Sequence, residues 1–237
     1  MSTPAKKAVP ASQTLSRGIR ILEILAQARD PLTIDEIAER LRVHRSIAYR
    51  LLRTLEDHGL IVRDSAGRIA LGPRMAALAA GVASDLQAEA LPELTAIANE
   101  LGMTCFLAVL DRDETITLAS VEPRHAVASV AQRPGARHPA TVGAPSKAML
   151  SVTPEHEWPA GVTDELRSDV AEAVRLGYAV SHDEVIPTVQ AVAVPLLVRG
   201  QRPAAIAVLH VASPIDPAVL AARLRRSADA IREALGA

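Results

Sequence analysis

Aromatic residues and cysteines are scarce in this sequence, and long apolar runs are missing. Only 2% of the 237 residues are aromatic, so the core must consist mainly of Ala, Val, Leu and Ile side chains. The single cysteine, Cys105, cannot form a disulfide within the chain, which is typical of a reducing cytoplasm. No segment of about 18 uncharged apolar residues occurs, so we expect no membrane-spanning helix. Residues 1–12 lack the apolar stretch of a signal peptide and are predicted to form a disordered tail of a cytoplasmic protein.

The two parts of the chain differ in charge. Residues 1–75 carry 13 Lys and Arg residues against 8 Asp and Glu residues, whereas the remainder carries 13 against 19. A length of 237 residues fits either two domains or one large domain. An excess of basic residues of this size also arises by chance, but it suggests that the N-terminal part alone has a polyanionic partner.

Helical periodicity and capping residues predict three helices in the N-terminal part. The first covers residues 13–29, and the second begins at Thr33, where Thr33 and Glu36 match a capping box. The third covers residues 45–58 and ends before Gly59. The second and third are separated by only a few residues, which indicates a tight turn between them.

Two short apolar segments of strand length follow these helices. Residues 60–63 and 68–71 flank a turn of Asp, Ser, Ala and Gly, and they predict a β-hairpin. Two helices joined by a tight turn and followed by a hairpin are typical of a winged helix-turn-helix, here over residues 13–73.

The third predicted helix has one polar face and one apolar face. At about 100° per residue, Tyr49, Arg50 and Arg53 share a stripe, whereas leucines cover the opposite side. Arginine, serine and tyrosine can bond to base edges or phosphates in a DNA major groove. The alternative interpretation is a solvated helix whose arginines only keep it soluble. The predicted DNA-binding residues, taken from the helices and the hairpin, are Arg17, Arg20, Thr33, His44, Arg45, Ser46, Tyr49, Arg50, Arg53 and Arg68.

The rest of the sequence mixes helices with β-branched segments. An Ala-rich helix over residues 74–89 is predicted to link the two domains. It is either a plain core helix or, because of its position, a dimer contact. A further helix is expected to start at Pro92, because proline is favoured in the first turn. Strands are predicted at 104–110, 115–121, 127–131, 178–180, 191–198 and 204–211, and helices at 163–176 and 217–235. We expect an α/β domain over residues 91–237.

Several segments together resemble a known family. They are 15–22, 31–33, 45–56, 67–74, 104–121, 144–150, 176–180 and 192–195. With these segments the sequence resembles the isocitrate lyase regulator (IclR) family of bacterial transcriptional regulators. The resemblance implies an α+β fold with a winged helix-turn-helix, a linker helix at 74–90 and a GAF-like α/β effector-binding domain. It also implies double-stranded operator DNA and a small-molecule effector as partners, no cofactor, and a homodimer that often pairs into a tetramer.

The effector half departs from the family pattern. Thr141 to Ala144 replace a run that commonly resembles His-Ala-Thr, Ala191 replaces a frequent cysteine, and Ala207 and Leu209 replace small hydroxyl residues. Fewer polar groups remain to bind a carboxylate, so we expect a neutral or apolar effector, or one paired with His210 as a cation. By resemblance, the predicted effector-binding residues are Thr141, Val142, Gly143, Ala144, Asp183, Gln190, Ala191, Ala207, Leu209 and His210.

The alternative class is an α/β enzyme or small-molecule-binding protein with an incidental basic N-terminal domain. No Gly-x-Ser-x-Gly elbow, P-loop, Gly-x-Gly-x-x-Gly or His-Glu-x-x-His motif occurs, so we expect neither enzymatic activity nor a metal site. The cluster of His182, Asp183 and Glu184 is interpreted as a solvated strand end rather than a metal or ligand site. Cys105 is interpreted as an inert core thiol rather than a redox sensor.

Overall fold

The computed structural model describes residues 12–125, 130–211 and 213–236. The chain divides between Val82 and Ala83 into two compact units. The predicted tail, apart from Ser12, and most of the predicted strand at 127–131 lie outside the described residues. No helix in the described part of the chain is long and apolar enough to cross a membrane.

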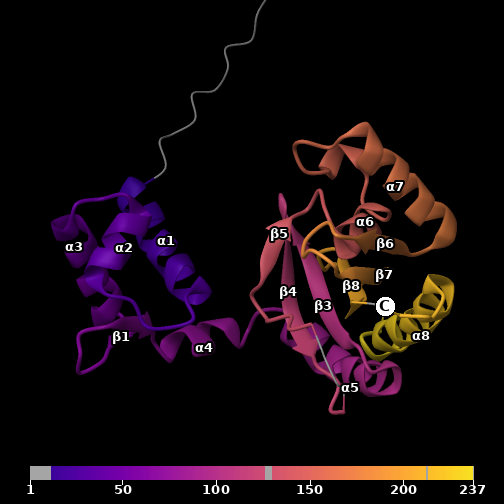
Figure 1. Ribbon diagram of the computed structural model, residues 1–237, viewed down its shortest axis with the longest axis horizontal. Helices are drawn as coiled ribbons and strands as arrows, with labels where there is room; N and C mark the ends of the chain where they lie inside the picture. The colour runs from indigo at the N-terminus through magenta and orange to yellow at the C-terminus, as the bar shows by residue number, and fades with distance from the viewer. Residues whose placement is uncertain (1–11, 126–129, 212, 237) are drawn as a thin grey trace, which may run out of the picture. The chain divides into compact units, whose positions relative to one another are not determined.

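The N-terminal unit consists of helices and a two-stranded hairpin (Figure 1). Its elements are α1 (Gln13–Gln27), α2 (Ile34–Leu41), α3 (Arg45–Asp57), β1 (Ile61–Arg63), β2 (Ile69–Leu71) and α4 (Arg74–Ala79). The hairpin is antiparallel, and an additional bridge joins Leu32 to Ile69. The predicted helix-turn-helix and hairpin are therefore present, and the bridge fixes the hairpin to the segment that enters α2.

The core of this unit forms where the apolar stripes of its helices meet the hairpin. Ile21, Ile37 and Leu52 come from α1, α2 and α3, and all three are fully buried. Ile61 and Ile69 extend this core into the two strands. Burial of one stripe of α3 leaves its opposite stripe in solvent, as its helical periodicity predicts.

Close backbone contacts define the turn between α2 and α3 and the crossing after the hairpin. Arg42, between α2 and α3, has a left-handed conformation (φ 56°), which lets the amide of Val43 bond to the carbonyl of Ala38 at 3.0 Å. After the hairpin, the amide of Gly72 bonds to Leu60 O at 2.8 Å. A Cβ at Gly72 would overlap the carbonyl oxygen of Gly59, so this crossing requires glycine.

The C-terminal unit is built on a six-stranded sheet with the strand order β5-β4-β3-β8-β7-β6. The strands are β3 (Thr104–Asp111), β4 (Glu114–Val121), β5 (Arg137–Pro139), β6 (Ala179–His182), β7 (Gln190–Leu196) and β8 (Ala204–His210). All neighbouring strands are antiparallel. Together with its helices the sheet makes the whole chain an α+β protein, as expected.

Helices cover both faces of this sheet (Figure 1). α5 (Ser84–Leu101) and α8 (Pro217–Ala234) pack on the face that carries Val192 and Val208. α6 (Ala144–Leu150) and α7 (Asp164–Leu176) pack on the face that carries Ala191 and Leu209. A short 3-10 helix at Glu155–Glu157 precedes α7. Because successive strand residues point to opposite faces, each central strand contributes to both cores.

The linker region differs from the sequence-based expectation. A single helix was expected over 74–89, but α4 ends at Ala79 and α5 begins at Ser84, after Ala83 in a left-handed conformation (φ 46°). The helix expected to start at Pro92 was also wrong, because Pro92 lies inside α5. The apolar stripe of α5 packs against the sheet both before and after the proline, and this burial outweighs the missing hydrogen bond.

Candidate DNA interface and ligand pocket

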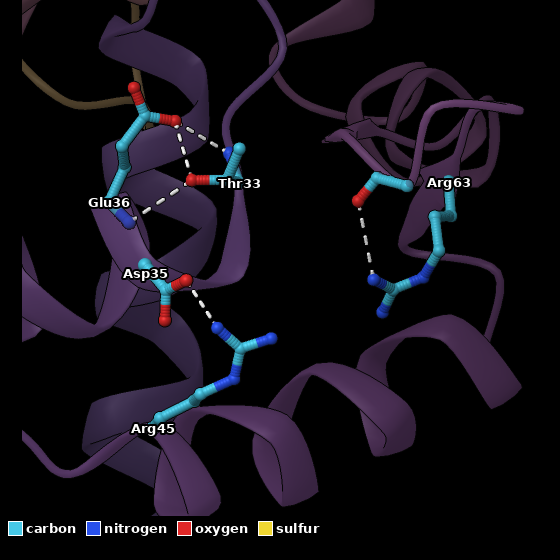
Figure 2. A network of polar contacts seen from close by, with 6 residues as sticks. Thr33, Asp35, Glu36, Arg45 and Arg63 are labelled. Atoms are coloured by element: carbon cyan, nitrogen blue, oxygen red, sulfur yellow. Dashed lines mark hydrogen bonds and ion pairs between the residues drawn. The ribbon is translucent and has the colours of Figure 1, made fainter.

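Capping interactions set the start of both helices of the helix-turn-helix. The Thr33 amide donates to Glu36 Oε2 at 2.7 Å, and the Glu36 amide donates to Thr33 Oγ1 at 3.3 Å, which completes the predicted capping box (Figure 2). Hydrogen bonds from the backbone and side chain of Thr33 hold the pKa of Glu36 below its ordinary value. At α3, Nδ1 of His44 accepts from the Ser46 amide at 3.3 Å. Thr33 thus caps the N-terminus of α2, and its contact with DNA stays a prediction.

The outward stripe of α3 carries the predicted DNA-binding side chains. Six of them are exposed, namely His44, Arg45, Ser46, Tyr49, Arg50 and Arg53. The guanidinium of Arg45 reaches across to Asp35 on α2 and forms an exposed ion pair (Figure 2). Among the described residues, neither Arg50 nor Arg53 has an ion-pair partner within 4.0 Å, so both guanidiniums are available to an anion.

The hairpin presents further arginines beside a tight turn. Oδ1 of Asp64 accepts from the amides of Ala66 at 2.9 Å and Arg68 at 2.8 Å, which closes the turn. The exposed guanidinium of Arg68 donates to Pro31 O at 3.2 Å. Arg63 is half-buried, donates to Gly67 O at 3.4 Å (Figure 2) and pairs with Glu56 at 3.5 Å. Because strand residues alternate between faces, Arg63 lies on the side of the buried Ile61, and it holds the hairpin to α3.

Helix α1 contributes the two remaining arginines of the predicted interface. Arg20 is exposed and Arg17 is half-buried. Both lie on the first two turns of the helix, where Ser12 accepts from the amide of Leu15 at 3.4 Å. Their contact with a DNA backbone stays a prediction.

The C-terminal unit contains a cavity on the α6 and α7 side of its sheet. The cavity has an empty volume of about 370 Å³, which includes its open mouth. Its walls combine sheet residues, residues around the start of α6 and residues of the loop between β6 and β7. They are Phe106, Gln132, His138, Gly143, Pro145, Ser181, Val185, Ile186, Val189, Ala191 and Leu209. The mostly apolar lining suits a small and largely apolar ligand.

Only part of the predicted effector set lies in this cavity. Gly143, Ala191 and Leu209 line it, whereas Thr141, Val142 and Ala144 belong to the adjoining loop and the first residue of α6, and Ala207 lies further along β8. The carboxylate of Asp183 accepts from the Thr188 amide instead of facing the cavity. The cavity residues that the sequence-based list missed come mostly from distant strands and from the β6–β7 loop.

Gln190 and His210 lie on the wrong face of the sheet for this cavity. They pair with each other across β7 and β8, and each directly neighbours a lining residue along its strand. Successive side chains of a strand point to opposite faces, so both point toward the α5 and α8 side. His210 is buried, burial lowers its pKa, and its Nδ1 has no hydrogen-bond partner among the described residues. The pairing of an effector with His210 as a cation stays a prediction, and neither the lowered pKa of His210 nor its face of the sheet supports it.

Two carboxylates of the same chain pair with a buried lysine beside the cavity. Lys147 Nζ lies 2.7 Å from Asp169 Oδ2 and 2.5 Å from Glu184 Oε1. Burial alone would lower the pKa of Lys147, but the two carboxylates outweigh burial and raise it. The second oxygen of Glu184 accepts from the Gly143 amide at 2.8 Å. Glu184 is exposed, as expected of a solvated strand end, and it also pins the β6–β7 loop to the start of α6.

Other candidate chemical groups are accounted for by the fold. Cys105 is fully buried on β3, and burial raises the pKa of its thiol far above the ordinary value, which agrees with an inert core residue. In the described part of the chain, no group of three His, Cys, Asp or Glu side chains is arranged to hold a metal ion.

An arginine-bearing helix-turn-helix unit joined to an α/β unit with a largely apolar cavity is typical of a class of transcriptional regulators. One unit of such proteins binds DNA and the other binds a ligand. The model of the IclR helix-turn-helix domain matches residues 14–65, and the model of the bacterial transcriptional regulator IclR C-terminal domain matches residues 79–233. The chain therefore belongs to the IclR family of bacterial transcriptional regulators.

Individual relatives agree with this assignment. XynR of Escherichia coli K12 is 27% identical over 96% of this chain and 99% of its own length. Rv1719 of Mycobacterium tuberculosis is 32% identical over 60% of this chain, a match that spans 55% of that regulator. An IclR-type regulator from Alicyclobacillus acidocaldarius has 30% identity and a TM-score of 0.81, with 96% and 100% of the two chains covered. An IclR homologue from Microbacterium hydrocarbonoxydans, complexed with 4-hydroxybenzoate, has 25% identity and a TM-score of 0.79, with 94% and 99% covered.

Proposed function

We propose that the chain binds operator DNA by inserting the exposed stripe of α3 into the major groove. The observation that carries this proposal is the set of uncommitted polar side chains on that stripe, above all Arg50 and Arg53. A guanidinium can donate two hydrogen bonds to a guanine or bind a phosphate. Arg68 on the hairpin and Arg17 and Arg20 on α1 contact the backbone of the duplex in this proposal.

A small molecule in the C-terminal cavity regulates DNA affinity in this proposal. The cavity is lined mainly by apolar side chains, and its nearest buried cation, Lys147, is already paired with Asp169 and Glu184. The complex of the Microbacterium homologue with 4-hydroxybenzoate supports a small ligand for the C-terminal domain. To change DNA affinity, the ligand must bind one conformer of the chain more tightly than another.

The functional form in this proposal is a homodimer, with a tetramer as a further assembly. The described N-terminal unit exposes large apolar side chains on α1 and around α4, namely Leu15, Ile19, Leu78 and Val82. Contact with a second copy would remove this apolar surface from water. Light scattering after size-exclusion chromatography should give at least twice the monomer mass, and a monomer at micromolar concentration would contradict the proposal.

The experiment that tests DNA binding is retardation of duplex DNA at increasing salt. Fragments from the upstream region of the gene should bind at low salt and lose affinity steeply as salt rises, because phosphate contacts release counterions. A fragment of equal length from inside a gene provides the sequence control. No retardation of any upstream fragment at low salt would contradict the proposed function and favour a ligand-binding protein without a DNA target.

A further inference from the structure

The cavity has no cationic side chain among its lining residues. The wall of the cavity carries two uncharged donors, Gln132, which donates to Thr117 Oγ1 at 2.7 Å, and the hydroxyl of Ser181. Beside the cavity lie two further donors that would suit a carboxylate, the Gly143 amide and Lys147 Nζ. Glu184 already accepts from both, at 2.8 and 2.5 Å. An anionic ligand placed there would meet a carboxylate and no free cation, and an unpaired charge is costly to bury.

His138 supplies the cavity with a directed hydrogen-bond acceptor. Its Nδ1 lies 3.0 Å from the carbonyl oxygen of Pro139. Because a carbonyl oxygen only accepts, Nδ1 carries the ring proton, and in the neutral ring Nε2 is then a bare acceptor. Burial lowers the pKa of His138, which favours the neutral ring. No other described residue forms a hydrogen bond with this ring.

The position of the ring places Nε2 at the cavity wall. A Cβ built on Gly143 would lie 3.7 Å from Nε2 of His138 and 3.0 Å from Cγ2 of Val185. The side chains of His138 and Val185 therefore both border the space that a Cβ of Gly143 would fill, and all three residues line the cavity. The walls beyond them include Phe106 and Leu209, which offer an apolar surface to the body of a ligand.

We propose that this cavity selects an uncharged small ligand with an apolar or aromatic body and a hydroxyl or N–H donor. The donor bonds to Nε2 of His138, which is the specificity-determining residue. This selectivity rests on the proposed effector role of the same cavity. The mostly apolar walls, among them Phe106 and Leu209, suit the body of a single-ring ligand.

Three single-ring probes separate the contributions of donor and charge. Calorimetric titration of the full chain with phenol, anisole and benzoate at pH 7.5 compares a donor, its methyl ether and a carboxylate. We expect phenol to bind about tenfold more tightly than anisole, because the ether leaves the acceptor of His138 unpaired. Benzoate should bind more weakly than phenol. In protein labelled with ¹⁵N-histidine, phenol should shift the Nε2 resonance of His138 and leave its Nδ1–H tautomer unchanged.

Two substitutions assign the selectivity to His138. His138→Phe keeps an aromatic ring but removes the acceptor, so phenol and anisole should bind with equal affinity. His182→Phe is the matched control, because His182 is exposed on β6 and does not line the cavity. Circular dichroism checks that both variants fold. If His138→Phe unfolds the protein, His138→Gln, which retains an acceptor, should keep the preference for phenol.

The outcomes distinguish this inference from the proposed function. Preferential binding of benzoate by the wild-type chain, or absence of binding by all three probes, would overturn the inference. An unchanged phenol preference in His138→Phe would overturn it as well. If carboxylates bind and alter DNA retardation, the effector role holds and the selectivity is wrong. If phenol binds through His138 but no cavity ligand alters DNA retardation, the selectivity holds and the effector role fails.

Discussion

Substitution of Arg50 by alanine tests the proposed role of α3 most directly. Arg50 is exposed near the middle of the outward stripe, and the buried residues Ala48 and Leu52 lie on the other side of the helix. Removal of its side chain should therefore change the free energy of unfolding by no more than about 0.5 kcal/mol. Any loss of DNA affinity can then be assigned to the interface.

The size and type of the loss depend on what Arg50 contacts. If its guanidinium binds a phosphate, affinity falls alike for all sequences, and the slope of log K against log salt becomes shallower by about 0.9. If it donates to a base, the slope changes little and discrimination at one base pair falls by about 1–3 kcal/mol, roughly 5- to 150-fold. The two contacts therefore differ in both salt dependence and specificity.

Fluorescence anisotropy with a duplex selected from random sequence, repeated between 50 and 200 mM salt, measures both quantities. Arg232→Ala is the matched control, because it removes the same charge from α8 in the other unit, where Arg232 pairs with Asp229. We expect Arg232→Ala to leave slope and specificity as in the wild type. Equal affinity, slope and discrimination for Arg50→Ala and wild type would refute the placement of α3 in the groove.

Other predictions concern the stability of each unit and the charge beside the cavity. Leu52→Ala should destabilise the N-terminal unit by about 2–5 kcal/mol, because Leu52 is fully buried, and calorimetry should show a lower Tm for that unit alone. Gly72→Ala should destabilise the same unit by about 1–3 kcal/mol in urea unfolding, because its Cβ overlaps the Gly59 carbonyl. Lys147→Met should destabilise the C-terminal unit in urea unfolding by about 1–3 kcal/mol, less than a fully buried pair, because its partners are 41% and 26% exposed. Glu184→Ala should strengthen benzoate binding in calorimetric titration by about tenfold, because the Gly143 amide and Lys147 Nζ lose the Glu184 carboxylate to which they donate.

The chain offers matched controls for these substitutions. Arg53→Ala changes the exposed neighbour of Leu52 and should leave the Tm nearly unchanged. Gly81→Ala introduces a Cβ with no atom within 4 Å and should be tolerated. Arg175→Met breaks an exposed ion pair with Glu172 and should have little effect. Equal destabilisation by a variant and its control, or benzoate affinity unchanged in Glu184→Ala, would contradict the corresponding explanation.

The N-terminal unit could be predicted almost completely because its signals are local. The capping box of Thr33 and Glu36 acts within one helical turn, and the periodicity of α3 separates Leu52 from Arg53 without any knowledge of the partners. In the linker, local rules failed, since Pro92 suggested a helix start that packing against the sheet overrides.

In the C-terminal unit, side chains alternate between the two faces of a strand, and the effector-binding residues predicted by family resemblance do not follow this alternation. Leu209 and His210 were both predicted to line the effector site, although adjacent strand residues face opposite sides of a sheet. The same rule separates Ala191 from Gln190. Of these four residues, the structure places Leu209 and Ala191 at the cavity and the other two on the opposite face.

The sequence by itself determined the helix-turn-helix and the exposed arginines of α3. Only the tertiary structure decided which residues share the cavity. The strand order β5-β4-β3-β8-β7-β6 brings Phe106 on β3 to the same cavity as Leu209 on β8, more than one hundred positions away in the sequence. The loop that places Glu184 on Lys147 likewise joins distant positions. Periodicity and capping arise from neighbours within one or two turns, whereas a cavity is formed by contacts whose partners the local sequence does not specify.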